Sequence, residues 1–136
     1  VEPDFRQDAD LHYQPSTWPG ARIPHAWLFD QKGGRHSTLD LAGGGAFALF
    51  TGLGGAVWSE AAKTVAAEMG IMLHTHIIGP RQEFVDHTGD WARAREVGDA
   101  GCILTRPDQH VCWRHDGLPE DPTAELMRVL SAVLAR

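Results

Sequence analysis

The first candidate for cofactor chemistry is a glycine-rich turn, Gly52-Leu53-Gly54-Gly55, between an apolar segment and a predicted helix. A dinucleotide-binding fingerprint places G-x-G-x-x-G at such a turn and a carboxylate at the end of the next strand. Here the third glycine is misplaced, and the next predicted strand ends in Ile77-Ile78-Gly79 without a carboxylate. The lysine and hydroxyl pair of a phosphate-binding loop is also missing. We interpret the stretch as a sharp strand-to-helix turn, and a weak anion site at the helix N-terminus is the alternative.

Thiol chemistry would need Cys102 and Cys112, the two cysteines of the chain. They lie on opposite arms of a predicted hairpin, so the register decides whether they could bridge. The sequence has no C-x-x-C pair and no signal peptide, which favours a reducing, cytoplasmic location and two free, packed thiols.

A metal site could use His74 and His76, which are two apart on a predicted strand and therefore share a face. A further ligand would have to come from His87 or His110. Because no cysteine or carboxylate stands at a recognisable spacing, we favour histidines that are hydrogen-bonded at a sheet face. No metal ligand is assigned.

Hydrolytic chemistry could use the polar group Asp86, His87 and Asp90, with Ser59 near the glycine turn. No G-x-S-x-G elbow is present, and the spacing does not fix a Ser-His-Asp geometry. Helix capping and loop solvation explain these residues, so no catalytic residue is assigned.

Tryptophan is abundant for this length and could line a pocket for an aromatic ligand. Such rings more often anchor a core or an interface. The five are Trp18, Trp27, Trp58, Trp91 and Trp113.

The composition predicts one folded domain. The chain has 136 residues, of which 43% are hydrophobic and 22% charged, and no apolar run approaches the roughly 20 residues that span a bilayer. The formal charge is −6 with scattered basic residues, which argues against nucleic acid as a partner. Residues 1–24 are rich in proline and poor in apolar residues, so we expect an arm or linker there and the domain in residues 25–136.

The elements that must position these residues are predicted from periodicity. The expected order is a short strand at 26–29, a helical turn or loop at 37–41, a central buried strand at 46–50, a helix containing Trp58 to Met69, and a strand at 71–78. A βαβ unit of this kind predicts parallel strands with a right-handed crossover.

The second half should contain a short helix within 88–97, beginning at Thr88 or Asp90. A hairpin then turns at 106–109, and a final helix begins with Asp121-Pro122 as its N-cap and first residue. By analogy, this order predicts an α/β, thioredoxin-like fold: a central mixed sheet flanked by helices, with a C-terminal hairpin and helix. The turn at 52–55 is where a thioredoxin would carry its C-x-x-C pair, so disulfide exchange is excluded at that position.

Four stretches in order resemble a known family. They are YQPSTWPGARIPHAWL (13–28), STLDLAGGGAFALFTG (37–52), GDWARAREVGDAGCILTRPDQHVCWR (89–114) and DPTAELMRVLSAVL (121–134). Together they resemble the C-terminal region of FAD-dependent aromatic hydroxylases, of the phenol and 2,4-dichlorophenol hydroxylase type, with their polyketide hydroxylase relatives.

The resemblance implies a domain that follows the FAD and substrate domains of such a monooxygenase and partners them within one polypeptide. FAD and NAD(P)H would then be cofactors of the parent enzyme, and no catalytic, cofactor-binding or metal residue maps onto this chain. The family domain is regarded as lacking thiol redox chemistry and as contributing to stability or subunit contacts, hence by hypothesis to a homodimer.

Two alternatives remain open. One is a small stand-alone redox protein that uses Cys102 and Cys112. The other is a binding module whose tryptophans hold an aromatic ligand or a protein partner.

One position departs from the resemblance. Many relatives carry glycine after Pro-Asp in the hairpin, where this chain has Gln109. If the turn keeps its shape, Gln109 carries a strain of about 1 kcal/mol.

Overall fold

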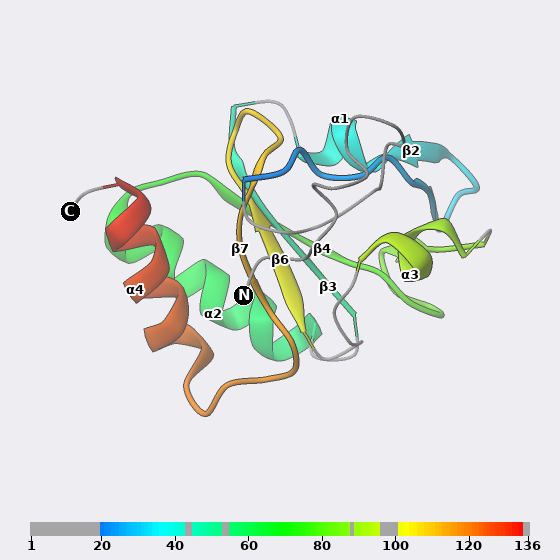
Figure 1. Ribbon diagram of the computed structural model, residues 1–136. Helices are drawn as coiled ribbons and strands as arrows, with labels where there is room; N and C mark the ends of the chain where they lie inside the picture. Colours follow the sequence, from blue (N-terminus) through cyan, green and yellow to red (C-terminus); the bar gives the residue numbers. More distant parts are fainter. Residues whose placement is uncertain (1–19, 43–44, 53–54, 88, 96–100, 135–136) are drawn as a thin grey trace.

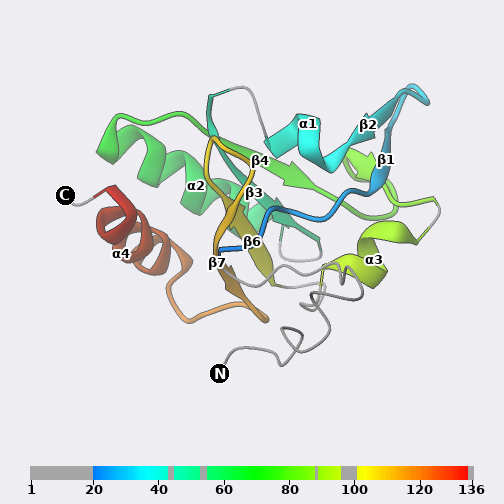
Figure 2. The same ribbon diagram turned by 45° about the horizontal axis from the view of Figure 1, so that its top comes forward.

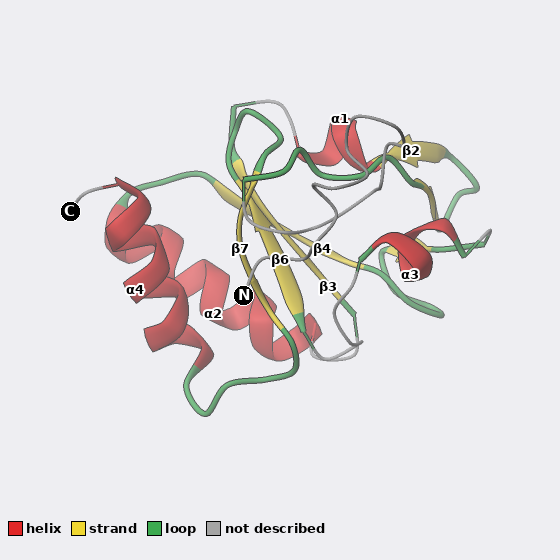
Figure 3. Ribbon diagram, viewed as in Figure 1, coloured by secondary structure: helices red, strands yellow, loops and turns green. Residues whose placement is uncertain are grey.

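The computed structural model describes residues 20–42, 45–52, 55–87, 89–95 and 101–134 (Figure 1). The elements in chain order are β1 (Trp27–Asp30), β2 (Arg35–Ser37), α1 (Thr38–Ala42), β3 (Phe47–Thr51), α2 (Gly55–Met69), β4 (Leu73–Ile77), β5 (Phe84–Val85), α3 (Asp90–Ala94), β6 (Cys102–Thr105), β7 (Val111–His115) and α4 (Pro122–Leu134) (Figure 3).

The central sheet has the strand order β4-β3-β6-β7. β3 pairs with β4 in parallel and with β6 antiparallel, and β6 and β7 form the predicted hairpin. The prediction of a central apolar strand followed by a parallel βαβ unit is confirmed. α2 and α4 lie side by side on one face of this sheet (Figures 1 and 2).

A second, smaller sheet has the order β2-β1-β5, with both pairs antiparallel. The sequence did not predict β2 and β5, because strands of three and two residues are too short to show a period. β1 belongs to this small sheet rather than to the central one. The stretch expected as a helical turn or loop at 37–41 forms the short helix α1.

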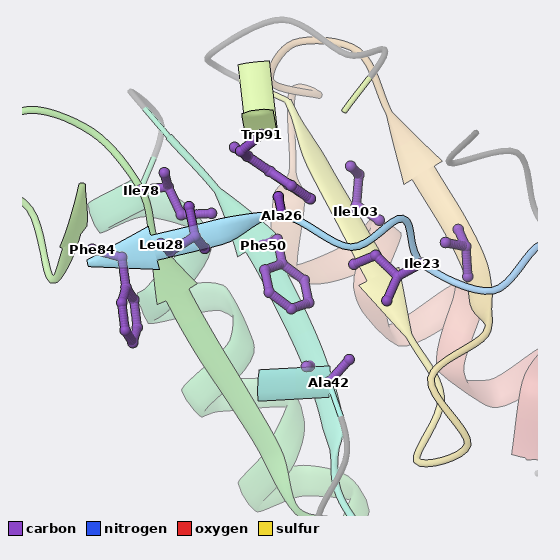
Figure 4. Packing of buried hydrophobic residues seen from close by; sticks show 11 residues of the cluster. Ile23, Ala26, Leu28, Ala42, Phe50, Ile78, Phe84, Trp91 and Ile103 are labelled. Carbon is purple, nitrogen blue, oxygen red and sulfur yellow. The ribbon is translucent and has the colours of Figure 1, made fainter. Parts of the chain in front are cut away.

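The core has two parts, one on each face of the central sheet. The side chains of β3 alternate between them: Ala48 and Phe50 enter the part under the small sheet, and Phe47 and Leu49 enter the part under α2 and α4. In Figure 4 the first part contains residues from β1, β3, β6 and α3. A strand covered on both faces needs the uninterrupted apolar run that the sequence shows at 46–50.

The helix ends follow from local chemistry. α2 stops before Gly70, whose φ of +66° suits the left-handed position after a helix. The Asp121 carboxylate accepts the Ala124 N–H at 3.1 Å, which confirms the predicted N-cap of α4.

The third helix, α3, begins at Asp90, one of the two predicted starting residues. The Asp86 carboxylate accepts the N–H groups of Trp91 and Ala92 at 3.3 and 3.0 Å, a capping contact that was not predicted. Thr88, the other predicted start, lies outside the described residues. Residues 96 and 97, which the prediction included, lie outside the described residues.

Residues 20–24, which the sequence assigns to the arm, are hydrogen-bonded to the hairpin. Gly20 N–H donates to the Val111 carbonyl at 2.7 Å, and Val111 N–H donates to the Ala21 carbonyl at 2.8 Å. Ile23 is only 2% exposed and belongs to the core. The other residues of the predicted arm, 1–19, lie outside the described part of the chain.

Within the described residues, no helix combines the length and apolar character that crossing a membrane requires.

Candidate functional site

The glycine turn joins β3 to α2 through backbone contacts and close packing. Gly55 N–H donates to the Gly52 carbonyl at 2.9 Å, and Ile78 N–H donates to the Thr51 carbonyl at 2.8 Å. A Cβ at Gly55 would lie 2.6 Å from Cγ2 of Ile77. Gly55 therefore lets the start of α2 pack closely against β4, which supports the interpretation as a strand-to-helix turn. Leu53 and Gly54 lie outside the described residues.

The cysteines do not face each other. Cys102 pairs with His115, whereas Cys112 lies at an irregularity in the β6–β7 pairing and its thiol contacts the Leu104 carbonyl at 3.5 Å. Both are free thiols, with Cys102 buried and Cys112 half-buried. Burial raises the pKa of the Cys112 thiol to about 11 and that of Cys102 further still. Neither is poised to form the reactive thiolate at neutral pH.

The histidines occupy separate environments. His76 lies between the rings of Phe50 and Phe84, with centroid distances of 5.3 and 5.7 Å, whereas His74 is exposed. The other two suggested ligands are elsewhere: His87 packs on Phe29, and His110 approaches Asp108 at the hairpin tip. In the described part of the chain, no three His, Cys, Asp or Glu residues are grouped as metal ligands.

Burial, rather than hydrogen bonding, defines the environment of His76. Its side chain is 13% exposed, and its Nδ1 atom lies 4.0 Å from a Glu83 carboxylate oxygen. Neither ring nitrogen has a hydrogen-bond partner among the described residues, so the expectation of a hydrogen-bonded histidine is wrong here. Desolvation lowers the pKa of His76 to about 4.

The polar group around Asp86 has a structural role. Asp86 caps α3, as described above, and the His87 ring lies 5.0 Å from the Phe29 ring. Asp90 is the first residue of α3, and Ser59 lies within α2. The structure brings Asp86 to the start of α3 but does not assemble a Ser-His-Asp arrangement from these described residues.

The tryptophans divide between core and surface. Trp58 and Trp91 are 0% and 3% exposed, which confirms core anchors at these positions. Trp113 packs against Trp58 at 6.0 Å. Trp27 is half-buried in the small sheet, and Trp18 lies outside the described residues.

A cavity of about 300 Å³ lies between the end of β4 and α3. Ile78, Pro80 and Val85 form apolar walls, and Trp91 and Arg95 contribute from the α3 side. This is the volume of a small ligand site. Periodicity alone could not indicate it, because its walls come from three separate segments.

Gln109 has the left-handed conformation that the turn prediction required, with a φ of +73°. Its side chain also links three parts of the chain. The amide nitrogen donates to the Leu39 carbonyl at 2.6 Å, and the amide oxygen accepts from Nη2 and Nε of Arg22 at 2.6 and 3.2 Å. These bonds offset the backbone strain, and no local sequence pattern indicates them.

The architecture and the turn that replaces a C-x-x-C pair define a thioredoxin-like domain. A solution structure of an uncharacterized thioredoxin-like protein from Porphyromonas gingivalis has a TM-score of 0.65 at 16% identity, over 86% of this chain and 94% of that one. The predicted fold class is confirmed.

The family is more specific than the fold. The family model described as "Aromatic-ring hydroxylase, C-terminal" matches residues 16–136, and the chain belongs to this family. It is 46% identical over 131 residues to 2,4-dichlorophenol 6-monooxygenase from Cupriavidus pinatubonensis, and 47% identical over 129 residues to phenol 2-monooxygenase from a Pseudomonas species. The resemblance predicted from the sequence motifs is confirmed.

The matches also show the extent of the domain within its relatives. They cover 96% and 95% of this chain but only 22% and 21% of the two relatives. The crystal structure of the flavin-dependent monooxygenase PieE, in complex with FAD and substrate, has a TM-score of 0.85 at 42% identity, over 99% of this chain and 23% of that one. The chain therefore spans about a fifth of the length of these monooxygenases.

Proposed function

We propose that this chain is the C-terminal, non-redox domain of a FAD- and NAD(P)H-dependent, phenol-type aromatic-ring monooxygenase. The observation that carries the proposal is the family match over residues 16–136, together with relatives that act on phenols. In this proposal residues 25–136 form the domain together with residues 20–24, which pair with the hairpin, and the arm before them leads from the FAD and substrate domains. The protein would act in the cytoplasm.

The absence of thiol chemistry in this proposal rests on the positions of the sulfurs. Gly52 and Gly55 border the turn after the central strand, where a thioredoxin needs its nucleophile. The two cysteines lie in the β6–β7 hairpin, with raised pKa values. A thiol with a pKa of about 11 is almost entirely protonated at neutral pH, so it attacks disulfides slowly.

The cofactor would be held by the preceding domains of the parent. The turn of this chain departs from the dinucleotide fingerprint because its third glycine is misplaced. β4 continues into Ile78 and Gly79 with no carboxylate for a ribose hydroxyl. This domain would contribute stability to the parent and, by hypothesis, a homodimer contact.

The coding frame upstream of Val1 tests the parent enzyme. We expect a G-x-G-x-x-G strand-turn-helix several hundred residues earlier in the same frame. A start codon immediately before Val1 would overturn the proposal and favour a stand-alone module.

Two assays on the purified chain test its role. An insulin-reduction assay with thiol titration should show no disulfide exchange, and rapid exchange would favour the stand-alone redox protein. Light scattering across a concentration series tests the dimer contact, which a constant monomer mass would contradict.

A second candidate, binding of an aromatic ligand, is favoured by the cavity beside Trp91. Phenol titration monitored by tryptophan fluorescence tests it. A saturable change that is lost in Trp91→Phe would support the candidate, and a change retained in that variant would place any binding elsewhere.

A further inference from the structure

The small sheet has an aromatic face that points away from the core. Strand pairing sets Phe29 opposite both Arg35 and Val85, so these three side chains share one side of the sheet. Leu28 and Phe84 alternate to the other side and are buried. The side that carries Phe29, which we call the outer face, is partly exposed and presents His25, Trp27, Phe29, Arg35 and His87. Ser37, opposite Trp27, is buried on this side, and Val85 at its edge also lines the cavity beside α3.

The aromatic rings of the outer face are held in place by their neighbours. The Arg35 guanidinium lies 4.1 Å from the centroid of the Trp27 ring, and the His25 ring meets Trp27 edge-on at 4.6 Å. Trp27 and Phe29 nevertheless remain only half-buried. Tryptophan and arginine supply a large share of the binding energy at protein interfaces, especially when they are already ordered.

Arg35 carries the positive charge of the outer face. Three nearby carboxylates contact other groups: Asp30 binds His36 at 2.8 Å, Glu83 lies 4.0 Å from His76, and Asp86 accepts two N–H groups of α3. A second copy of the same face would bring Arg35 toward its own equivalent, which is unfavourable in a two-fold interface. The face therefore suits an apolar surface with a carboxylate at its rim.

We propose that the outer face docks against the FAD- and substrate-binding part of the same polypeptide. This inference rests on the proposed function. The matched relatives are between four and five times as long as this chain, since it covers 22% and 21% of them, so most of such a polypeptide lies outside it. β1 follows the arm, through which the preceding part of such a polypeptide would be joined to this domain.

The placement of the small sheet is consistent with this docking. It lies at the end of the molecule away from α2 and α4 (Figures 1 and 2). Docking there would leave those helices uncovered and available for a separate subunit contact.

Hydroxyl-radical footprinting tests the proposal on the intact polypeptide and on the 136-residue chain. Trp27 is the reporter, and Trp113, also half-buried but on β7, is the matched control. In the intact polypeptide the oxidation rate of Trp27 should fall by about fivefold or more, because a docked anchor is shielded from water. The oxidation rate of Trp113 should stay within about twofold.

Each outcome separates this inference from the proposed function. A polypeptide that binds FAD while Trp27 stays as reactive as in the isolated chain overturns the docking proposal alone. Equal loss of reactivity at Trp27 and Trp113 also overturns it. Protection of Trp27 that rises with the concentration of the isolated chain identifies a second copy as the occupant and contradicts the proposal. An intact polypeptide without flavin overturns the proposed function.

A charge reversal localises the contact. Arg35→Glu in the intact polypeptide should restore most of the Trp27 reactivity, and Arg128→Glu, on the exposed surface of α4, should not. Circular dichroism of the isolated variants checks that both fold. If Arg35→Glu folds and Trp27 remains protected, Arg35 does not contribute to the docked interface. The proposed pairing of this rim with a carboxylate is then wrong.

Discussion

Replacing Gln109 by glycine removes backbone strain and hydrogen bonds at the same time, so its effect on stability shows which is larger. The left-handed conformation costs a non-glycine residue about 1 kcal/mol. Against this, the side chain donates to Leu39 and accepts from Arg22. Each such bond contributes about 1 kcal/mol, and a glycine adds about 0.5–1 kcal/mol of chain entropy to the unfolded state.

These terms predict that Gln109→Gly lowers the free energy of unfolding by about 1–2 kcal/mol, although glycine is the residue that the turn geometry prefers. Gln109→Ala loses the same hydrogen bonds and keeps the strain but avoids the entropy cost of glycine, so it should be less stable than Gln109→Gly by up to about 0.5 kcal/mol. The melting temperature of Gln109→Gly should fall by roughly 5 °C.

Chemical denaturation of the three proteins measures the order wild type, Gln109→Gly, Gln109→Ala. A double-mutant cycle with Arg22→Ala isolates the bond to the arm, and the two substitutions should be clearly non-additive. A Gln109→Gly protein as stable as wild type, or more stable, would refute the argument, because the three contacts would then contribute less than the strain.

Three further outcomes follow from the site. Folding lowers the pKa of His76 from 6.5 to about 4. The free energy of unfolding should therefore be highest above pH 6.5 and fall by up to about 3 kcal/mol as the pH drops toward 4. Denaturation at several pH values should show that His76→Phe flattens this dependence and that His74→Phe retains it. Gly55→Ala should lower the free energy of unfolding by about 1–3 kcal/mol, because the added methyl group meets Ile77. Calorimetry should show that Ile77→Ala partly rescues this loss. Additive losses in the double variant would contradict the packing argument. Ellman's reagent at pH 8 should modify Cys112 in the folded chain at well below the rate in denaturant; equal rates would show that burial does not suppress its thiolate.

Long, periodic elements could be predicted from the sequence. The apolar run at 46–50 and the helical spacing from Trp58 to Met69 each carry enough residues to show a period, and both elements form where expected. Proline and aspartate chemistry likewise predicted the hairpin turn and the start of α4. These signals are local, so they survive folding unchanged.

The small sheet could not be predicted because its stability is non-local. β2 has three residues and β5 has two, and both depend on β1 for pairing. The environment of His76 has the same origin: one of the rings that desolvate it, Phe50, lies on the neighbouring strand β3, and the other, Phe84, lies on β5 of the small sheet. The sequence spacing of His74 and His76 correctly placed them on one strand but could not show which one is covered.

The glycine spacing of the turn could be judged from the sequence, but its contacts could not. Counting the glycines at 52–55 argued against a dinucleotide loop, and the structure adds that Gly55 allows close packing against Ile77. The register of the cysteines needed the structure, because an irregularity beside Cys112 shifts the pairing. The contacts of Gln109 with Arg22 and Leu39 span 87 and 70 positions, beyond the reach of any local pattern.

The most direct test of the central claim is the flavin content of the purified 136-residue chain and of the intact polypeptide, each incubated with FAD and then assayed for phenol-stimulated NAD(P)H consumption. We predict stoichiometric flavin and stimulated consumption for the intact polypeptide, and neither for the isolated chain. A flavin spectrum with substrate-stimulated NAD(P)H consumption in the isolated chain would contradict the account.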